Sequence, residues 1–295
     1  MNLSNHQKGL AAGLFCFIFW GFAPLYFKLI QTVPALVIIA HRIIWGALFL
    51  FLYLLFRERI DIFKSLKLSK KHLFILFISG LLVSSNWLMF VWAVTHDQIL
   101  NTSLGYFINP LVNILFGVLF LHEKLNLAQK TALIIASFAT LFLGIYLGRA
   151  PWIALFLAFS FGLYGLVRKK LNVRPLVGLF WETLLLTVPA IVYLLFFADS
   201  LPQTNSANTI HLLLFFSGLV TVLPLLGFNY AAKNLALTLV GFLQYIAPTI
   251  SFLIAVYFYG EDFTLGHKVA FSGIWLALLI VSWSPFKKLI IPNSR

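Results

Sequence analysis

The sequence predicts an all-α membrane protein with ten transmembrane helices, arranged as two inverted five-helix repeats. Hydrophobic residues make up 61% of the 295-residue chain and charged residues only 10%. With a mean hydropathy of +0.98, this composition excludes an ordinary soluble globular domain. Apolar runs of about 17 to 23 residues, long enough to cross a bilayer as helices, occupy nearly the whole chain. Part of the sequence also recurs at a fixed offset.

The repeat relates two proline-containing hairpins. Three residues recur 138 positions later, so that Pro110, Glu123 and Lys130 return as Pro248, Glu261 and Lys268. We therefore expect an N-terminal five-helix repeat over residues 1–148 and a C-terminal one over residues 149–295. Because each repeat would hold an odd number of spans, the second would be inverted relative to the first, as in many secondary transporters.

The ten expected spans follow from the apolar runs in order. Five lie in the first half, at residues 10–30, 35–56, 73–95, 103–121 and 128–148. Five lie in the second half, at residues 151–167, 176–198, 211–231, 237–259 and 267–284. These runs are apolar on all sides, whereas the strands of a membrane barrel alternate apolar and polar residues, so helices are favoured.

Basic residues are concentrated in alternate connections. Of the 21 Lys and Arg residues, 17 lie on the side of the N-terminus, three lie on the other side (Lys28, Arg149 and Lys268), and Arg42 lies within a span. The positive-inside rule then places both termini in the cytoplasm. Although the net charge is +13, its spread over alternate loops argues against a nucleic-acid partner.

Glu182 is the acidic residue that lies well within an expected span, and its counterpart in the first half is the pair His41 and Arg42. An ionisable group inside a membrane is costly and by default marks a functional site. In one interpretation, Arg42 binds an anionic group of a substrate, such as a carboxylate, while Glu182 titrates and is the candidate for proton coupling. In the other, the two charges satisfy each other or backbone carbonyls and fix helix packing.

Further polar and aromatic residues occur at similar depths. The candidates for the lining of a substrate site are Asn86, Trp92, Tyr106, Asn109, Gln244 and Tyr245. Single Asn and Gln residues in membranes often serve as interhelical packing contacts instead. Tyr106 and Gln244 are stronger candidates, because each precedes a repeat proline by four residues, where a freed carbonyl can open the helix toward a cavity. Lys28 near the outer mouth either attracts anions or snorkels to the interface.

The sequence contains no catalytic, nucleotide or metal motif. GxxxxGK[ST], HExxH and GxSxG are absent, and the single Cys16 allows no internal disulfide. We therefore expect neither an enzyme nor an ATP-driven pump, and no cofactor or metal. The expected partners are a small-molecule substrate and membrane lipid, and small residues such as Gly117 and Gly144 would permit a homodimer.

Several strings together resemble the RarD family, in the EamA branch of the drug/metabolite transporter superfamily. They include WGFAPLYFK from Trp20, SLGYFINPL from Ser103, ETLLL from Glu182 and GFLQYIAPT from Gly241. The resemblance spans the chain and implies a multi-pass permease of the bacterial inner membrane that works by alternating access. Its substrate would be a small polar or amphipathic metabolite, such as an amino acid or a drug-like molecule. A non-transporting membrane sensor or assembly protein and a flippase for a lipid-linked substrate are the alternatives.

Overall fold

The computed structural model describes residues 4–58, 66–122, 124–171, 173–197, 207–235, 240 and 243–290, and the regular elements in these residues are helices. The first half contains α1 (Asn5–Gly21), α2 (Ala23–Leu29), α3 (Ala35–Glu58), α5 (Lys70–Thr95), α6 (Ile99–Leu121) and α7 (Leu127–Tyr146). The second half contains α8 (Trp152–Lys170), α9 (Pro175–Phe196), α10 (Ala207–Asn234), α12 (Ile246–Leu253), the π-helical turn η2 (Ile254–Phe258) and α13 (Leu265–Ile290). Seven helical stretches in the described residues are long and apolar enough to cross a membrane, and three shorter apolar ones accompany them.

Several helices begin where local side chains satisfy the first free backbone amides. At α1, Ser4 Oγ accepts from the amide of Gln7 at 3.2 Å, and Gln7 Oε1 accepts from the amide of Ser4 at 2.9 Å. Asn126 and Gln129 form the same reciprocal capping box at α7. Such boxes satisfy two amides that have no partner within the helix. The starts of α1 and α7 are therefore encoded within a few residues.

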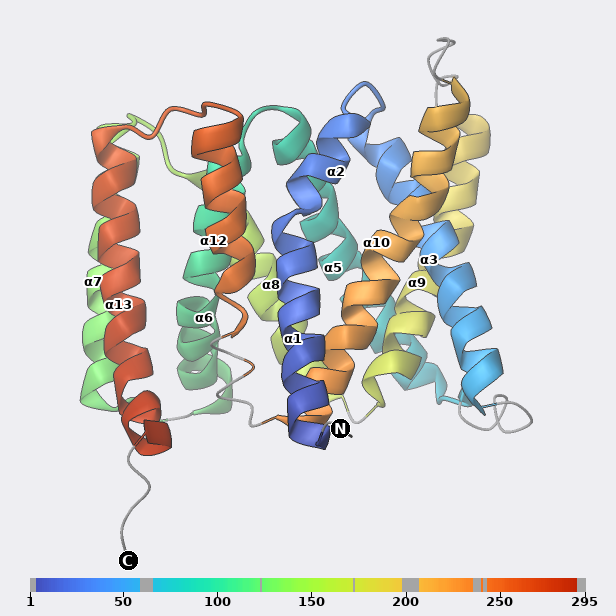
Figure 1. Ribbon diagram of the computed structural model, residues 1–295. Helices are drawn as coiled ribbons and strands as arrows, with labels where there is room; N and C mark the ends of the chain where they lie inside the picture. Colours follow the sequence, from blue (N-terminus) through green and yellow to red (C-terminus); the bar gives the residue numbers. More distant parts are fainter. Residues whose placement is uncertain are drawn as a thin grey trace, which may run out of the picture.

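The helices stand side by side, and the start of α1 and the end of α13 lie at the same end of the bundle (Figure 1). At the opposite end lie α2, the turn between α5 and α6, and the connection between η2 and α13. The outer face of α7 exposes large apolar side chains, among them Ile134, Phe138 and Ile145. An apolar exterior of this kind suits a bundle surrounded by lipid.

Helices from the two halves pack against each other throughout the bundle. The main pairs are α7 with α13, α6 with α8, α1 with α10, α3 with α10, α3 with α9, α5 with α8, α5 with α9, and α1 and α6 with α12. Most of these pairs join a helix of the first half to one of the second. Several of the candidate site residues described below have partners in the other half of the chain.

The two spans that contain the repeat prolines, Pro110 and Pro248, differ from each other. Helix α6 continues through Pro110, whereas the prediction of one helix over 237–259 is wrong. Gln244 and Tyr245 form a turn, and α12 begins after them. Pro248 thus lies in the first turn of a helix, where its missing N–H leaves no bond unmade. Residues 236–239, 241 and 242, and Glu123 of the repeat, lie outside the described residues.

The predicted first span, 10–30, is also interrupted. Helix α1 ends at Gly21, and α2 begins at Ala23, after the single residue Phe22, with Pro24 in its first turn. The other predicted spans correspond to described helices, with ends that shift by a few residues.

Candidate substrate site

Arg42 is the buried cation at the centre of the candidate site, with 7% of its surface exposed. Its Nε donates a hydrogen bond to Thr221 Oγ1 at 2.5 Å, from α3 to α10. Its guanidinium lies over the ring of Trp87, 4.4 Å from the centroid, and 5.6 Å from the ring centroid of Phe27. No carboxylate forms an ion pair with Arg42 among the residues that the structure describes. A charged group is therefore held here by rings and a hydroxyl.

The close approach of α3 and α10 explains why Thr221 reaches Arg42. Gly218, one turn before Thr221, lies against Trp45, one turn after Arg42. A Cβ atom at Gly218 would lie 2.7 Å from the backbone carbonyl carbon of Trp45, so only glycine fits. The spacing of these two helices is thus set beside the arginine.

Glu182 lies in a separate buried cluster and is 1% exposed. Ser79 donates to its Oε1 at 2.6 Å and the Tyr164 hydroxyl donates to its Oε2 at 3.2 Å. Arg168 Nη1 lies 3.5 Å from Oε1, within ion-pair distance. The carboxylate thereby connects α9 with α5 and α8. Whether Arg42 and Glu182 pair directly was open from the sequence, and the structure gives each of them other partners.

Asn86 and Asn109 connect neighbouring helices through hydrogen bonds. Asn86 Nδ2 donates to the carbonyl of Leu157 and to Ser160 Oγ, both at 2.9 Å. The Tyr106 hydroxyl donates to Asn86 Oδ1 at 3.3 Å. Asn109 Nδ2 donates to the carbonyl of Ala158 at 3.0 Å. Both amides thus fasten α8 to α5 and α6, and Tyr106 belongs to the same network.

The other predicted site residues lie with different neighbours. His41 Nδ1 accepts from Trp45 Nε1 at 3.3 Å. At the far end of α5, Trp92 stacks on His96 with 4.5 Å between ring centroids. Tyr245 stacks on Phe107 with a centroid distance of 6.4 Å, and Gln244 is half-buried in the turn beside it. The structure therefore brings Asn86 and Tyr106 together, but not the whole predicted set.

Comparison with known proteins places the chain in a family. The profile of the EamA-like transporter family matches residues 7–145 and, a second time, residues 149–283. The chain belongs to the EamA-like transporter family. It is thus a multi-pass membrane protein of a transporter family.

Individual relatives make this chain a RarD-type EamA protein. It is 45% identical to protein RarD of Salmonella typhi over 282 residues. This alignment covers 95% of this chain and 96% of that protein. It is 43% identical to an uncharacterized transporter, YojE, of Bacillus subtilis over 290 residues. This alignment covers 97% of each of the two chains. A crystal structure with 18% sequence identity matches with a TM-score of 0.62, over 94% of this chain and 97% of that one. This last likeness supports the fold alone.

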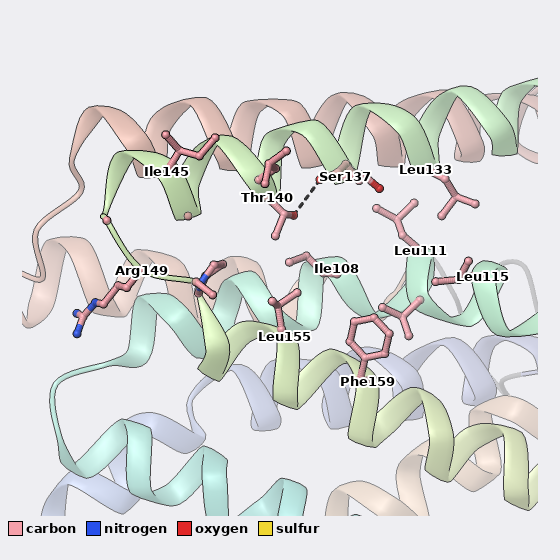
Figure 2. A pocket seen from close by; sticks show the side chains of 17 residues that line it. Ile108, Leu111, Leu115, Leu133, Ser137, Thr140, Ile145, Arg149, Leu155 and Phe159 are labelled. Atoms are coloured by element: carbon pink, nitrogen blue, oxygen red, sulfur yellow. Dashed lines mark hydrogen bonds between the residues drawn. The ribbon is translucent and has the colours of Figure 1, made fainter.

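Two cavities of this EamA protein lie between different sets of helices. The larger, of about 660 Å³, lies between α6, α7 and α8, with Ile108, Leu155 and Phe159 directed into it and Arg149 at one end (Figure 2). None of the predicted site residues lines it. The smaller, of about 440 Å³, is lined by Tyr26 and Val220, the sequence neighbours of Phe27 and Thr221. Neither of these two cavities is lined by Arg42 or by its partners Trp87, Phe27 and Thr221.

The sequence did not identify three partners of Arg42 in this EamA protein. Trp87 is an aromatic residue deep in its span, next to Asn86, and this position is the feature of the sequence that could have pointed to it. Phe27 is one of 32 phenylalanines, so its type gave no signal. Thr221 also bonds the carbonyl of Ser217, one turn earlier in α10, at 3.3 Å, as helical threonines commonly do.

Proposed function

We propose that this chain is a permease that moves a small metabolite carrying an anionic group, such as a carboxylate, by alternating access. It would act in the bacterial inner membrane with both termini in the cytoplasm. Arg42 would bind the anionic group of the substrate. The observation that carries this proposal is a buried guanidinium without a carboxylate partner among the described residues.

The physical chemistry of Arg42 favours an anionic ligand. Burying a cation without an opposite charge costs several kcal/mol, and each aromatic contact returns only about 0.5 to 2 kcal/mol. Thr221 accepts from one of the five N–H donors of the guanidinium. A carboxylate could accept from two of the others at once, the strongest arrangement available to this pair. A ligand would thus supply what the protein leaves out.

The surroundings of Arg42 indicate what the rest of the substrate could be. Trp87 and Phe27 present ring faces to the guanidinium. Aromatic walls with a few polar groups are typical of sites for small amphipathic molecules. An amino acid or another small carboxylate fits this chemistry. Asn86 and Asn109 would support the site by fixing α5, α6 and α8.

The packing of the helices supports ten spans in two inverted repeats, 1–148 and 149–295. We match the helices of the two repeats in chain order: α1 with α8, α3 with α9, α5 with α10, α6 with α12, and α7 with α13. Under this match, each main pair of packed helices corresponds to another main pair or to itself. The pair α6 with α8 corresponds to α12 with α1, and α1 with α10 corresponds to α8 with α5. The pairs α3 with α9 and α7 with α13 map onto themselves. Such symmetry suits a transporter whose halves rock around a site between them.

Transport in proteoliposomes tests the proposal. Purified protein is reconstituted, the vesicles are loaded with unlabelled amino acids and small carboxylates, and the uptake of each labelled compound is followed. We expect at least one carboxylate to exchange in the wild type and in Arg149→Gln, but not in Arg42→Gln. The Arg149 variant is the matched control, because it removes an exposed arginine outside the site. Equal exchange in Arg42→Gln, or exchange of neutral compounds only, would contradict the proposal.

A further inference from the structure

The larger cavity lies along the outside of the bundle and opens between α7 and α8. Its floor consists of buried residues of α6, of which Leu111 is 2% exposed. Its rims carry exposed side chains, with Leu141 of α7 58% exposed and Phe159 of α8 38% exposed. Helix α7 packs mainly against α13, while α6 and α8 pack against each other. The cavity is therefore a groove that faces the surrounding lipid, and we call it the lateral groove.

The internal repeat indicates why the lateral groove is open. At the repeat offset of 138 residues, Ser137 of α7 corresponds to Trp275 of α13. The ring of Trp275 packs against Phe252 of α12, with 5.7 Å between centroids, and against Phe107 of α6, with 5.9 Å between centroids. Ser137 lines the lateral groove and has no ring to place there. A small side chain thus leaves a space that its counterpart in the other repeat fills.

The lining of the lateral groove suits a hydrocarbon chain. Most of the lining residues are apolar, and the Thr140 hydroxyl donates to the carbonyl of Ala136 at 2.8 Å. Apolar cavities stay dry, and walls without partner atoms lose dispersion contacts. From Leu133 to Ile145 the groove follows α7 for roughly 18 Å, at about 1.5 Å per residue. This length is close to the depth of one leaflet, which is half of a hydrocarbon core about 30 Å thick.

A cation lies at the outer end of the lateral groove. Arg149 is exposed in the connection between α7 and α8, and its guanidinium extends beyond the end of the groove (Figure 2). Lys28, on the same side, pairs with Asp97, whereas no acidic residue pairs with Arg149 among the residues that the structure describes. By the charge distribution of the sequence, this side faces the outside. Arg149 therefore lies at the level of the lipid headgroups of the outer leaflet.

We propose that the lateral groove binds one acyl chain of an anionic phospholipid of the outer leaflet, with the phosphate of that lipid beside Arg149. The acyl chain supplies the contacts that α7 does not make with α6 and α8. The guanidinium donates to the phosphate oxygens, which can accept two parallel bonds from an arginine. None of the predicted substrate-site residues lines the groove, so this inference does not depend on the proposed permease function.

Native mass spectrometry of the full chain tests the inference. Delipidated protein in detergent is titrated with phosphatidylglycerol, or with phosphatidylcholine of the same acyl chains, and the dissociation constant of the first bound lipid is measured. We expect the wild type to bind phosphatidylglycerol about fivefold more tightly, the effect typical of one basic residue near a membrane surface. Arg149→Gln should remove this preference. Lys268→Gln, the matched control, should keep it, because Lys268 is a basic residue of the same side that does not line the groove.

A second variant tests the groove itself. Ser137→Trp should weaken the binding of both lipids about tenfold or more, since displacing roughly two methylene groups from an apolar site has this effect. The new ring would occupy the groove as Trp275 occupies its counterpart. Phe138→Trp is the matched control, because Phe138 is 67% exposed and does not line the groove. It should bind both lipids as the wild type does.

Three outcomes would overturn the inference. They are equal binding of the two lipids to the wild type, a preference for phosphatidylglycerol that persists in Arg149→Gln, and wild-type lipid binding in Ser137→Trp. The first needs no variant and the second changes only an exposed side chain, so both decide the matter even if Ser137→Trp fails to fold. Because the lateral groove is separate from Arg42, none of these results bears on the proposed transport.

Discussion

Arg42 and Glu182 are both charged residues buried in apolar helices, yet their surroundings differ. The carboxylate of Glu182 has two hydroxyl donors and a guanidinium within reach. The guanidinium of Arg42 has one hydroxyl and two ring faces. A satisfied buried charge holds helices together, whereas an unsatisfied one is available to a ligand. On our proposal, partners and not depth alone separate the structural charge, Glu182, from the binding charge, Arg42.

The largest effect is expected at the structural charge. Glu182→Leu removes the carboxylate that faces Arg168, so we expect the free energy of unfolding to fall by about 3 to 5 kcal/mol. Unfolding by heat or denaturant in detergent measures this. Glu182→Gln is the matched control, because its amide retains hydrogen bonds, and it should lose less. A stable Glu182→Leu protein that no longer transports would reverse the comparison and make Glu182 the functional residue.

The binding charge should respond in the opposite way. Arg42→Met replaces the guanidinium with an apolar chain of similar length, and replacing a buried charge that has no ion partner is often neutral or stabilising. We expect an unfolding free energy within about 1 kcal/mol of the wild type or above it, with a loss of about 1.5 to 3 kcal/mol in the binding of a carboxylate. Thermal unfolding with and without ligand measures both. A strong loss of stability would make Arg42 a packing residue.

A smaller effect is expected where the helices approach each other beside Arg42. Gly218→Ala would place a Cβ 2.7 Å from the backbone of Trp45, and such overpacking typically costs about 1 to 3 kcal/mol. Substrate affinity should fall as well, since Thr221 would move away from the arginine. Gly46→Ala is the matched control on α3, because a Cβ there would meet nothing within 4 Å. Equal effects of the two variants would show that the spacing of α3 and α10 does not position Arg42.

The sequence predicted the helices well because their signal is local. Each span is an apolar run, and capping residues such as Ser4 and Asn126 lie within three residues of the amides they satisfy. The break before Pro248 was not predictable, because Pro110 in a similar string lies within a continuous helix. Tertiary packing, and not the residue type, decides between these two outcomes.

The candidate site was predictable only in part, for the same reason. Arg42 stood out as a charge in an apolar run, but its partners Thr221 and Phe27 come from other helices and have no distinctive pattern. Glu261 lies between two expected spans and had no assigned contact, whereas its carboxylate binds the start of α6. Contacts between residues more than a hundred positions apart leave no trace in local periodicity.

The most direct test of the comparison is calorimetric binding of matched ligand pairs, each a small carboxylate and its uncharged amide, to the wild type, Arg42→Met and Glu182→Gln. We predict that a carboxylate binds the wild type and Glu182→Gln with similar affinity, that its amide binds at least about tenfold more weakly, and that Arg42→Met does not distinguish the two. If Arg42→Met retained the preference for the carboxylate while Glu182→Gln lost it, the assignment of the binding charge to Arg42 would be contradicted.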